Sequence, residues 1–233
     1  MHAVPAHPVV SGPFGRGAAA VWVVRPAVPV RAVVVFGHGW KVAPPSASYP
    51  WVGQFRPWLD HLAARGDAVI FPRYQLGGAD AQDASRVRDY EAGAVAGYAR
   101  LGRPRVPLVA AGYSYGATLA FYLAADARRL GLPVPRAIDA VFAAGPVPGV
   151  RLGAIATTTR VLLQVGDRDT EAGSGGANAF SALLRARGVR TVRYEVVRSR
   201  GAFVADHAAP KGTTATARAA FWSPLDALVA QAE

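Results

Sequence analysis

The sequence of 233 residues contains no cysteine. This absence excludes disulfide bonds, a thiolate nucleophile and cysteine-based metal sites. It leaves the compartment open, because secreted proteins can also lack cysteine. The first residues, Met1 to Pro5, show neither the charged nor the apolar region of a signal peptide. We therefore leave localisation undecided between the cytoplasm and secretion after removal of a signal peptide.

Long hydrophobic runs are also missing. The most apolar windows, Val106 to Ala111 and Val161 to Val165, have the length of strands and fall short of the roughly 20 residues that span a bilayer. We expect a soluble protein with no integral membrane association. With 52% hydrophobic residues, and with 25 glycines and 18 prolines that follow no fixed period, the chain is expected to form one domain over residues 1–233. Residues 1–18 are expected to be an irregular leader.

Lysine is scarce, although the chain is strongly basic. The formal net charge is +11, and Lys41 and Lys211 are the only lysines among 26 basic residues. The arginines are spread along the chain, with no basic run longer than Arg128-Arg129, whereas nucleic-acid-binding faces show basic clusters with interleaved aromatics. We therefore expect no nucleic-acid partner. The composition does not decide the oligomeric state.

Apolar segments rich in valine and isoleucine alternate with segments of helical periodicity, which is typical of a mostly parallel sheet covered on both faces. The chain is thus predicted to be an α/β protein. Strands are expected at Ala19–Arg25, Ala32–Phe36, Ala68–Pro72, Val106–Ala111, Ile138–Ala143, Val161–Val165 and Thr191–Val197. Helices are expected at Gly53–Arg65, Ala84–Leu101, Tyr115–Leu130, Gly175–Arg187 and Pro224–Ala232. Ser223 is expected to cap the last helix, with Pro224 at its first position.

One predicted strand runs into a short glycine-serine motif. Val106 to Ala111 is followed by residues 112–116, Gly-Tyr-Ser-Tyr-Gly, and then by a helical stretch. Gly-x-Ser-x-Gly between a strand and a helix is typical of a nucleophile elbow, which holds the serine at the carboxyl end of a central strand. The glycines leave room for neighbouring backbone, and the helix N-terminus favours negative charge at the serine. Ser114 is therefore the candidate nucleophile.

An earlier predicted strand ends in residues 37–40, Gly-His-Gly-Trp. In this position a backbone N–H completes an oxyanion hole together with the N–H of the residue after the nucleophile. We assign the two donors to Trp40 and Tyr115. His38 belongs to the loop itself, so its ring is expected to brace the loop by hydrogen bonds rather than to transfer protons.

A serine nucleophile needs a base, and the chain has five histidines. Four of them are poorly placed: His2 and His7 in the proline-rich leader, His38 in the oxyanion loop and His61 within a predicted helix. His207 follows the last predicted strand, at the sheet edge where α/β proteins place reactive groups. His207 is therefore the candidate base.

Two carboxylates compete to orient His207. The predicted strand Val161 to Val165 is followed by Gly-Asp-Arg-Asp, which contains Asp167 and Asp169. We prefer Asp169, because the turn must first lift the chain off the strand and this brings the later residue nearer to the imidazole. Asp167 is expected to pair with Arg168 or to cap the turn, and it remains the alternative acid.

The chain order of oxyanion loop, serine, acid and histidine resembles the α/β-hydrolase superfamily, over a range from about Val21 to Ala230. Within it the chain is most similar to compact bacterial esterases and lipases of the dienelactone-hydrolase-like group. Dienelactone hydrolase itself has a cysteine nucleophile, so its activity is not carried over. Ser114 excludes haloalkane dehalogenases, whose elbow carries an aspartate.

The resemblance implies a serine hydrolase that cleaves carboxylic esters through an acyl-enzyme, without a metal or an organic cofactor. The short segment Pro146–Arg160 leaves no room for a helical cap domain. We therefore expect an open cleft for short-chain or polymer esters, with Tyr49, Trp51 and Phe203 on loops that line it. The alternatives are an acyltransferase or a peptidase with the same triad, and a non-catalytic binding module of the same fold.

Overall fold

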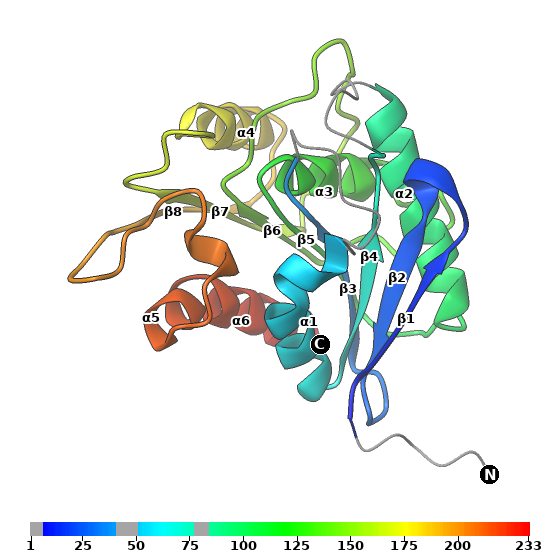
Figure 1. Ribbon diagram of the computed structural model, residues 1–233. Coiled ribbons are helices and arrows are strands. Elements are labelled where there is room, and N and C mark those ends of the chain that lie inside the picture. The colour runs from blue at the N-terminus through cyan, green and yellow to red at the C-terminus, as the bar shows by residue number, and fades with distance from the viewer. Residues whose placement is uncertain (1–6, 41–50, 77–83) are drawn as a thin grey trace.

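Eight strands of the described chain form one sheet, in the order β1-β2-β4-β3-β5-β6-β7-β8 (Figure 1). The structure, a computed structural model, describes residues 7–40, 51–76 and 84–233, and of Trp51 the backbone alone. The strands are β1 Val9–Phe14, β2 Val21–Arg25, β3 Ala32–Gly37, β4 Asp67–Pro72, β5 Leu108–Tyr113, β6 Ala137–Val141, β7 Arg160–Gly166 and β8 Thr191–Val197. The pairs β1 with β2 and β2 with β4 are antiparallel, and the other neighbouring strands run parallel.

Helices cover both faces of this sheet. They are α1 Arg56–Ala64, α2 Ala84–Arg100, α3 Tyr115–Asp126, α4 Gly175–Ala186, α5 Ala215–Ala217 and α6 Ser223–Ala232. Figure 1 shows α2, α3 and α4 on one face and α1, α5 and α6 on the other. Along β3, Val33 and Val35 pack into the core under the first group, whereas Val34 and Phe36 pack into the core under the second. Because both faces are buried, the central strands are continuous apolar runs.

The seven strands predicted from the sequence are present, with ends shifted by at most two residues. The prediction of an irregular leader is wrong for Val9–Phe14, which forms β1. Pro8, Gly12 and Pro13 argued against a strand in this segment. β1 lies at the edge and bonds to β2 alone, and an edge strand tolerates proline because it needs donors on one side only.

The five predicted helices are present as well, but the expected start of the last one is wrong. Ser223 does not cap this helix, because its backbone and that of the residue before it are already helical. The helical segment begins at Ala215, after Thr214, whose hydroxyl accepts a backbone N–H of the first turn at 3.2 Å. It passes through a π-helical turn at Arg218–Trp222 into α6.

Pro224 therefore lies inside a continuous helix rather than at its start. Proline has no N–H, so it cannot donate to the carbonyl of Ala220 four residues earlier. The side-chain amide of Gln164, on β7, donates to that carbonyl instead, at 2.8 Å. The sheet thus supplies the donor that the helix lacks, and this replacement makes the internal proline tolerable.

The carboxyl ends of the parallel strands β3 to β8 lie together, and we call this side of the sheet the carboxyl edge and the opposite side the amino edge. Between β6 and β7, the segment Pro146–Thr159 contains neither helix nor strand, so no helical cap is inserted there. In the described ranges, no helix has the length and apolar character needed to cross a membrane. The same ranges contain no group of three or more histidine, aspartate or glutamate side chains suited to a metal ion.

Candidate active site

Ser114 lies at the carboxyl edge, between β5 and α3. Its backbone has φ 56° and ψ −125°, a combination that costs a non-glycine residue about 1–3 kcal/mol. Its N–H donates to the carbonyl of Val141 at 2.8 Å, and its own carbonyl accepts the N–H groups of Ala117 and Thr118 at 3.0 and 3.2 Å. These bonds hold the serine in the strained turn of a nucleophile elbow.

Glycines allow the loop after β3 to pack directly against this turn. A Cβ atom on Gly116 would lie 2.2 Å from the carbonyl carbon of Gly37. A Cβ atom on Gly39 would lie 2.6 Å from the Tyr113 ring and 3.4 Å from Cβ of Ser114. Distances under 3 Å leave no room for a side chain, so the Gly-His-Gly loop reaches the serine only because these positions are glycine.

The imidazole of His207 lies between Ser114 and Asp169. Its Nε2 is 3.1 Å from Oγ of Ser114, and its Nδ1 is 3.1 Å from each carboxylate oxygen of Asp169. With the proton of a neutral imidazole on Nδ1, donated to the carboxylate, Nε2 is free to accept the serine proton. The structure thus brings together the three residues that the sequence analysis selected, from the loops after β5, β7 and β8. The arrangement can convert the hydroxyl into a nucleophile.

Asp169 is held as an ionised partner of the histidine. Its side chain is fully buried, and Oδ1 also accepts the backbone N–H groups of Glu171 and Ala172 at 2.9 and 3.1 Å. Burial raises the pKa of this carboxyl, but the hydrogen bond from His207, the two N–H groups and the charge of the imidazolium outweigh it, so the pKa lies below its ordinary value. A carboxylate in this state stabilises positive charge on His207.

Asp167, the alternative acid, has another partner. It is exposed and accepts hydrogen bonds from the backbone N–H and the hydroxyl of Ser199, rather than from the expected Arg168. It thereby joins the loop after β7 to the loop after β8. A Cβ atom on Gly166 would lie 2.1 Å from the carbonyl oxygen of Ala205. The two loops, and with them the histidine and its acid, approach this closely only because that position is glycine.

Two aromatic side chains that the sequence analysis did not select support His207. The hydroxyl of Tyr113 donates to the His207 carbonyl at 2.5 Å, and the two ring centroids are 4.9 Å apart. Phe142, directly after β6, is fully buried with φ 58°, and its ring stacks on the imidazole at 5.9 Å. Tyr113 could have been found as the aromatic residue inside the Gly-x-Ser motif. Phe142 has no comparable signal in the sequence.

The two residues assigned to the oxyanion hole are neighbours in the structure. The rings of Trp40 and Tyr115 meet edge to face, with centroids 5.5 Å apart. Tyr115 is the first residue of α3, and the N–H groups of a first helical turn are directed out of the amino end of the helix. Trp40 thus contacts the residue that follows Ser114, and the role of the two N–H groups as oxyanion donors remains a prediction.

His38 is part of the loop framework. It is buried, and its Nδ1 and Nε2 lie 2.8 Å and 2.5 Å from the carbonyl oxygens of Gly39 and Arg73. Tyr74 donates to the His38 carbonyl at 2.7 Å and stacks on its ring at 4.2 Å. These contacts confirm that the ring braces the loop.

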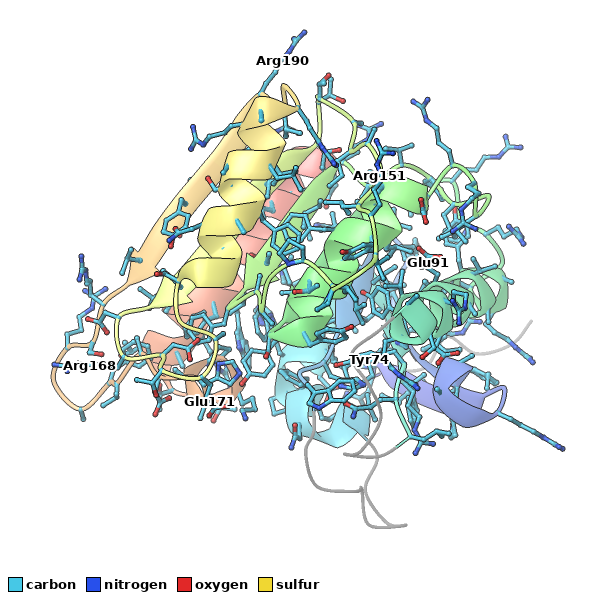
Figure 2. All side chains as sticks on the ribbon, turned by 90° about the horizontal axis from the view of Figure 1, so that it is seen from above. Tyr74, Glu91, Arg151, Arg168, Glu171 and Arg190 are labelled. Carbon is cyan, nitrogen blue, oxygen red and sulfur yellow. The ribbon has the colours of Figure 1, made fainter. Side chains whose placement is uncertain are left out.

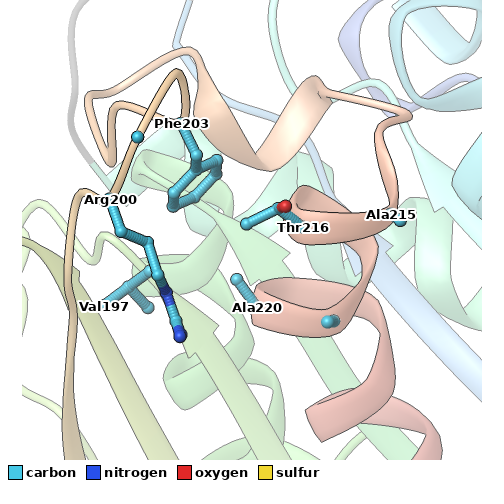
Figure 3. A pocket seen from close by; sticks show the side chains of 8 residues that line it. Val197, Arg200, Phe203, Ala215, Thr216 and Ala220 are labelled. Atoms are coloured by element: carbon cyan, nitrogen blue, oxygen red, sulfur yellow. The ribbon is translucent and has the colours of Figure 1, made fainter.

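The predicted substrate-lining residues are placed only in part. Tyr49 and the side chain of Trp51 lie outside the described residues. Phe203 lines a hollow of about 550 Å³ between the loop after β8 and α5, together with residues that include Arg200 and Thr216 (Figure 3). None of the described residues around this hollow belongs to the Ser-His-Asp series. The role of Phe203 in substrate binding remains a prediction.

Solved structures match this chain along most of its length. A bacterial heroin esterase has a TM-score of 0.68 at 17% identity, with 97% of this chain and 84% of that chain covered. Esterase B from Lactobacillus rhamnosis has a TM-score of 0.65 at 15% identity, with 98% and 88% covered. Esterase 2 from Thermogutta terrifontis has a TM-score of 0.64 at 19% identity, with 97% and 95% covered. No protein-family model and no curated protein matches the sequence.

At these identities the likeness concerns the fold. The eight-stranded, mostly parallel sheet with helices on both faces is shared with the esterases, and it carries the elbow at the end of a central strand. The more specific dienelactone-hydrolase-like subgroup remains a prediction. The strand order, the elbow and the matching structures together show that the chain has the α/β-hydrolase fold.

Proposed function

We propose that the protein is a serine hydrolase that cleaves carboxylic esters through an acyl-enzyme. The proposal rests on one observation, the hydrogen-bonded series Ser114, His207 and Asp169. Oγ of Ser114 is 3.1 Å from Nε2 of His207, and Nδ1 of His207 is 3.1 Å from each carboxylate oxygen of Asp169. Such a series activates a serine hydroxyl for attack on a carbonyl carbon. The shared fold of several proteins named esterases supports the reaction class.

In the proposed reaction His207 takes the proton of Ser114 while Oγ attacks the ester carbonyl carbon. Asp169 stabilises the imidazolium, and the N–H groups of Trp40 and Tyr115 bind the oxyanion. His207 then gives its proton to the departing alcohol oxygen, and the acyl group stays on Ser114. Water attacks the acyl-enzyme with His207 as base, and the acid leaves.

We further propose short-chain or polymer esters as substrates. The support is the irregular connection Pro146–Thr159, which contains no helix that could enclose the site. An open site binds small or extended substrates without a closing step. A series of nitrophenyl esters from acetate to palmitate, with a soluble polyester, measures this preference. Faster turnover of the long chains, or activity only at an oil–water interface, would contradict it.

The direct test of the function is Ser114→Ala. We expect ester turnover to fall by about 10⁴-fold or more, since loss of a triad nucleophile removes the covalent pathway. Thermal unfolding should remain cooperative with nearly the same midpoint. Ser181→Ala is the matched control, because Ser181 lies on α4 and its hydroxyl contacts only the exposed Arg185 among the described residues. More than a tenth of wild-type turnover in folded Ser114→Ala would refute the assignment.

A further inference from the structure

A second carboxylate lies next to the catalytic nitrogen of His207. Oε2 of Glu171 is 3.8 Å from Nε2, the nitrogen that also faces Ser114. This side chain is 74% exposed, so its carboxylate is open to water and to solutes. The backbone of Glu171 is fixed, because its N–H donates to Asp169 at 2.9 Å. This bond holds the backbone of Glu171 beside Asp169, and the carboxylate lies beside Nε2 of His207.

The charge of Glu171 is not neutralised by a close partner. Its separation from Nε2 is longer than a hydrogen bond, and in the described parts of the chain no arginine or lysine pairs with it. Lys211 lies on this side of the site, with its Nζ 5.5 Å from the Tyr113 ring. Asp206 also faces Tyr113, but its carboxylate is occupied with the N–H groups that follow it in the chain. Glu171 thus remains free to attract a bound cation.

This local charge opposes that of the molecule as a whole, which is +11. Figure 2 shows Glu171, Tyr74 and Arg168 at one end of the molecule and Arg190 and Arg151 towards the other. The acidic surroundings of the site also act on Tyr113: burial raises the pKa of its hydroxyl, and the charges of Glu171, Asp169 and Asp206 raise it further. The charges that raise the pKa of the Tyr113 hydroxyl, beside His207, are thus those of carboxylates.

The position of Glu171 decides which half of an ester it can contact. Nε2 of His207 returns its proton to the departing alcohol oxygen, so that oxygen must come within hydrogen-bonding distance of Nε2. The acyl half is held on the other side, at Ser114 and the oxyanion loop. A group that is attached to the alcohol a few bonds from its oxygen therefore comes close to Glu171.

Resting on the proposed function, we infer that Glu171 is a specificity-determining residue that favours esters whose alcohol carries a positive charge, such as an alkylammonium group. One unit charge about 4 Å away in well-hydrated surroundings changes kcat/KM by about three- to tenfold, and salt screens the effect. Esters of anionic alcohols are disfavoured by a similar factor.

The test compares butyrylcholine with its uncharged carbon isostere, in which a tert-butyl group replaces the trimethylammonium group. The readout is the ratio of the two kcat/KM values, which cancels any general effect on the serine or the histidine because both esters share the acyl group. We expect Glu171→Gln to lower this ratio three- to tenfold at low salt, and Glu171→Lys to lower it further. Added salt should lower the ratio in the wild type and leave it nearly constant in Glu171→Gln.

Glu233→Gln is the matched control, because it removes one negative charge at the C-terminus, where Glu233 pairs with Arg31. We expect it to leave the ratio unchanged. Equal ratios in the wild type and Glu171→Gln, with both esters cleaved, would overturn this inference and leave the proposed function standing. Turnover of nitrophenyl esters without cleavage of butyrylcholine or its isostere would also overturn the inference alone. Failure of the folded wild type to cleave any of these esters would overturn the proposed function and the inference with it.

Discussion

The carboxyl and amino edges of the sheet are built by different means. At the carboxyl edge, Tyr74, Ser114 and Phe142 have φ values of 51°, 56° and 58°, and glycines bring backbone segments into direct contact. At the amino edge, charged side chains meet in pairs: Arg31 with Glu233 at 2.6 Å, and Asp226 with His61 and Arg65 at 2.9 and 3.3 Å. Asp67 is buried beside these groups at the start of β4.

This difference between the two edges indicates that the carboxyl edge supports activity and the amino edge supports stability. A strained serine and closely packed loops fix reacting atoms at the expense of folding free energy. At the amino edge Arg103, on the loop before β5, has a similar φ of 52°, but this residue positions no reacting atom. Substitutions at the carboxyl edge should therefore reduce turnover far more than stability. Substitutions at the amino edge should change stability, or its pH dependence, and leave turnover intact.

The largest expected effect separates the two acids after β7. Asp169→Asn removes the charge that orients His207 and stabilises its protonated form, so we expect turnover to fall by about 10⁴-fold. Asp167→Asn is the matched control on the same loop, and its effect should be much smaller because Asp167 binds Ser199 instead. Steady-state kinetics with a nitrophenyl ester measures both. A larger loss in Asp167→Asn would show that the acid is assigned to the wrong residue.

A smaller effect is expected from one methyl group at the oxyanion loop. In Gly39→Ala the new Cβ would meet the Tyr113 ring at 2.6 Å, and this ring cannot move without disturbing its hydrogen bond to His207. We expect kcat to fall by about 10- to 100-fold, since displacements near 1 Å at reacting groups have this effect.

The control for this change is Gly175→Ala, at the start of α4. A Cβ atom there meets nothing within 4 Å, and alanine favours a helix over glycine. We expect normal turnover with equal or slightly higher stability. If Gly39→Ala kept full turnover, the loop would not be coupled to the serine as closely as the distances indicate.

At the amino edge the expected effect is on stability. Both carboxylate oxygens of Asp67 lack a hydrogen-bond partner among the described residues, and burial raises its pKa from 3.8 to about 6 against the lowering influence of Arg31 and Arg65. The folded state therefore binds this proton more tightly than the unfolded state, so stability falls as the pH rises from about 4 to about 6. Asparagine does not titrate, so Asp67→Asn should reduce this pH-dependent decrease in the free energy of unfolding by up to about 3 kcal/mol. Ester turnover should stay unchanged.

Urea unfolding at several pH values between 4 and 8 measures that difference. Asp60→Asn is the control, because Asp60 forms an exposed pair with Arg56 on α1 and should change the free energy of unfolding by less than about 1 kcal/mol at every pH. An unchanged pH dependence in Asp67→Asn would show that Asp67 is not the titrating group.

The sequence predicted the parts of the molecule that depend on periodicity and on local motifs. The central strands, the elbow at Ser114 and the order of the site residues follow from patterns within short windows. β1 was missed because proline and glycine oppose a strand, and its pairing with β2 is a tertiary effect. The start of the last helix was missed for a similar reason, since the donor from Gln164 comes from a strand far away in the chain.

Most of the site's supporting contacts are likewise tertiary. Phe142 stacks on His207 only after β6 is placed beside β5, and nothing in its neighbouring residues indicates this. Glu171 was not selected because an exposed carboxylate in a turn is ordinary in sequence. Its distance from Nε2 of His207 depends on the loop after β8 folding back over the loop after β7.

The central claim is that Ser114 is an activated nucleophile, and covalent labelling tests it most directly. A fluorophosphonate probe reacts with a serine hydroxyl that a neighbouring base activates, and the serine oxygen displaces fluoride from phosphorus. We expect a stoichiometric adduct that peptide mass spectrometry assigns to Ser114, no adduct in Ser114→Ala, and much slower labelling in His207→Ala. An adduct on another residue, or ester turnover that persists after complete labelling of Ser114, would contradict the account.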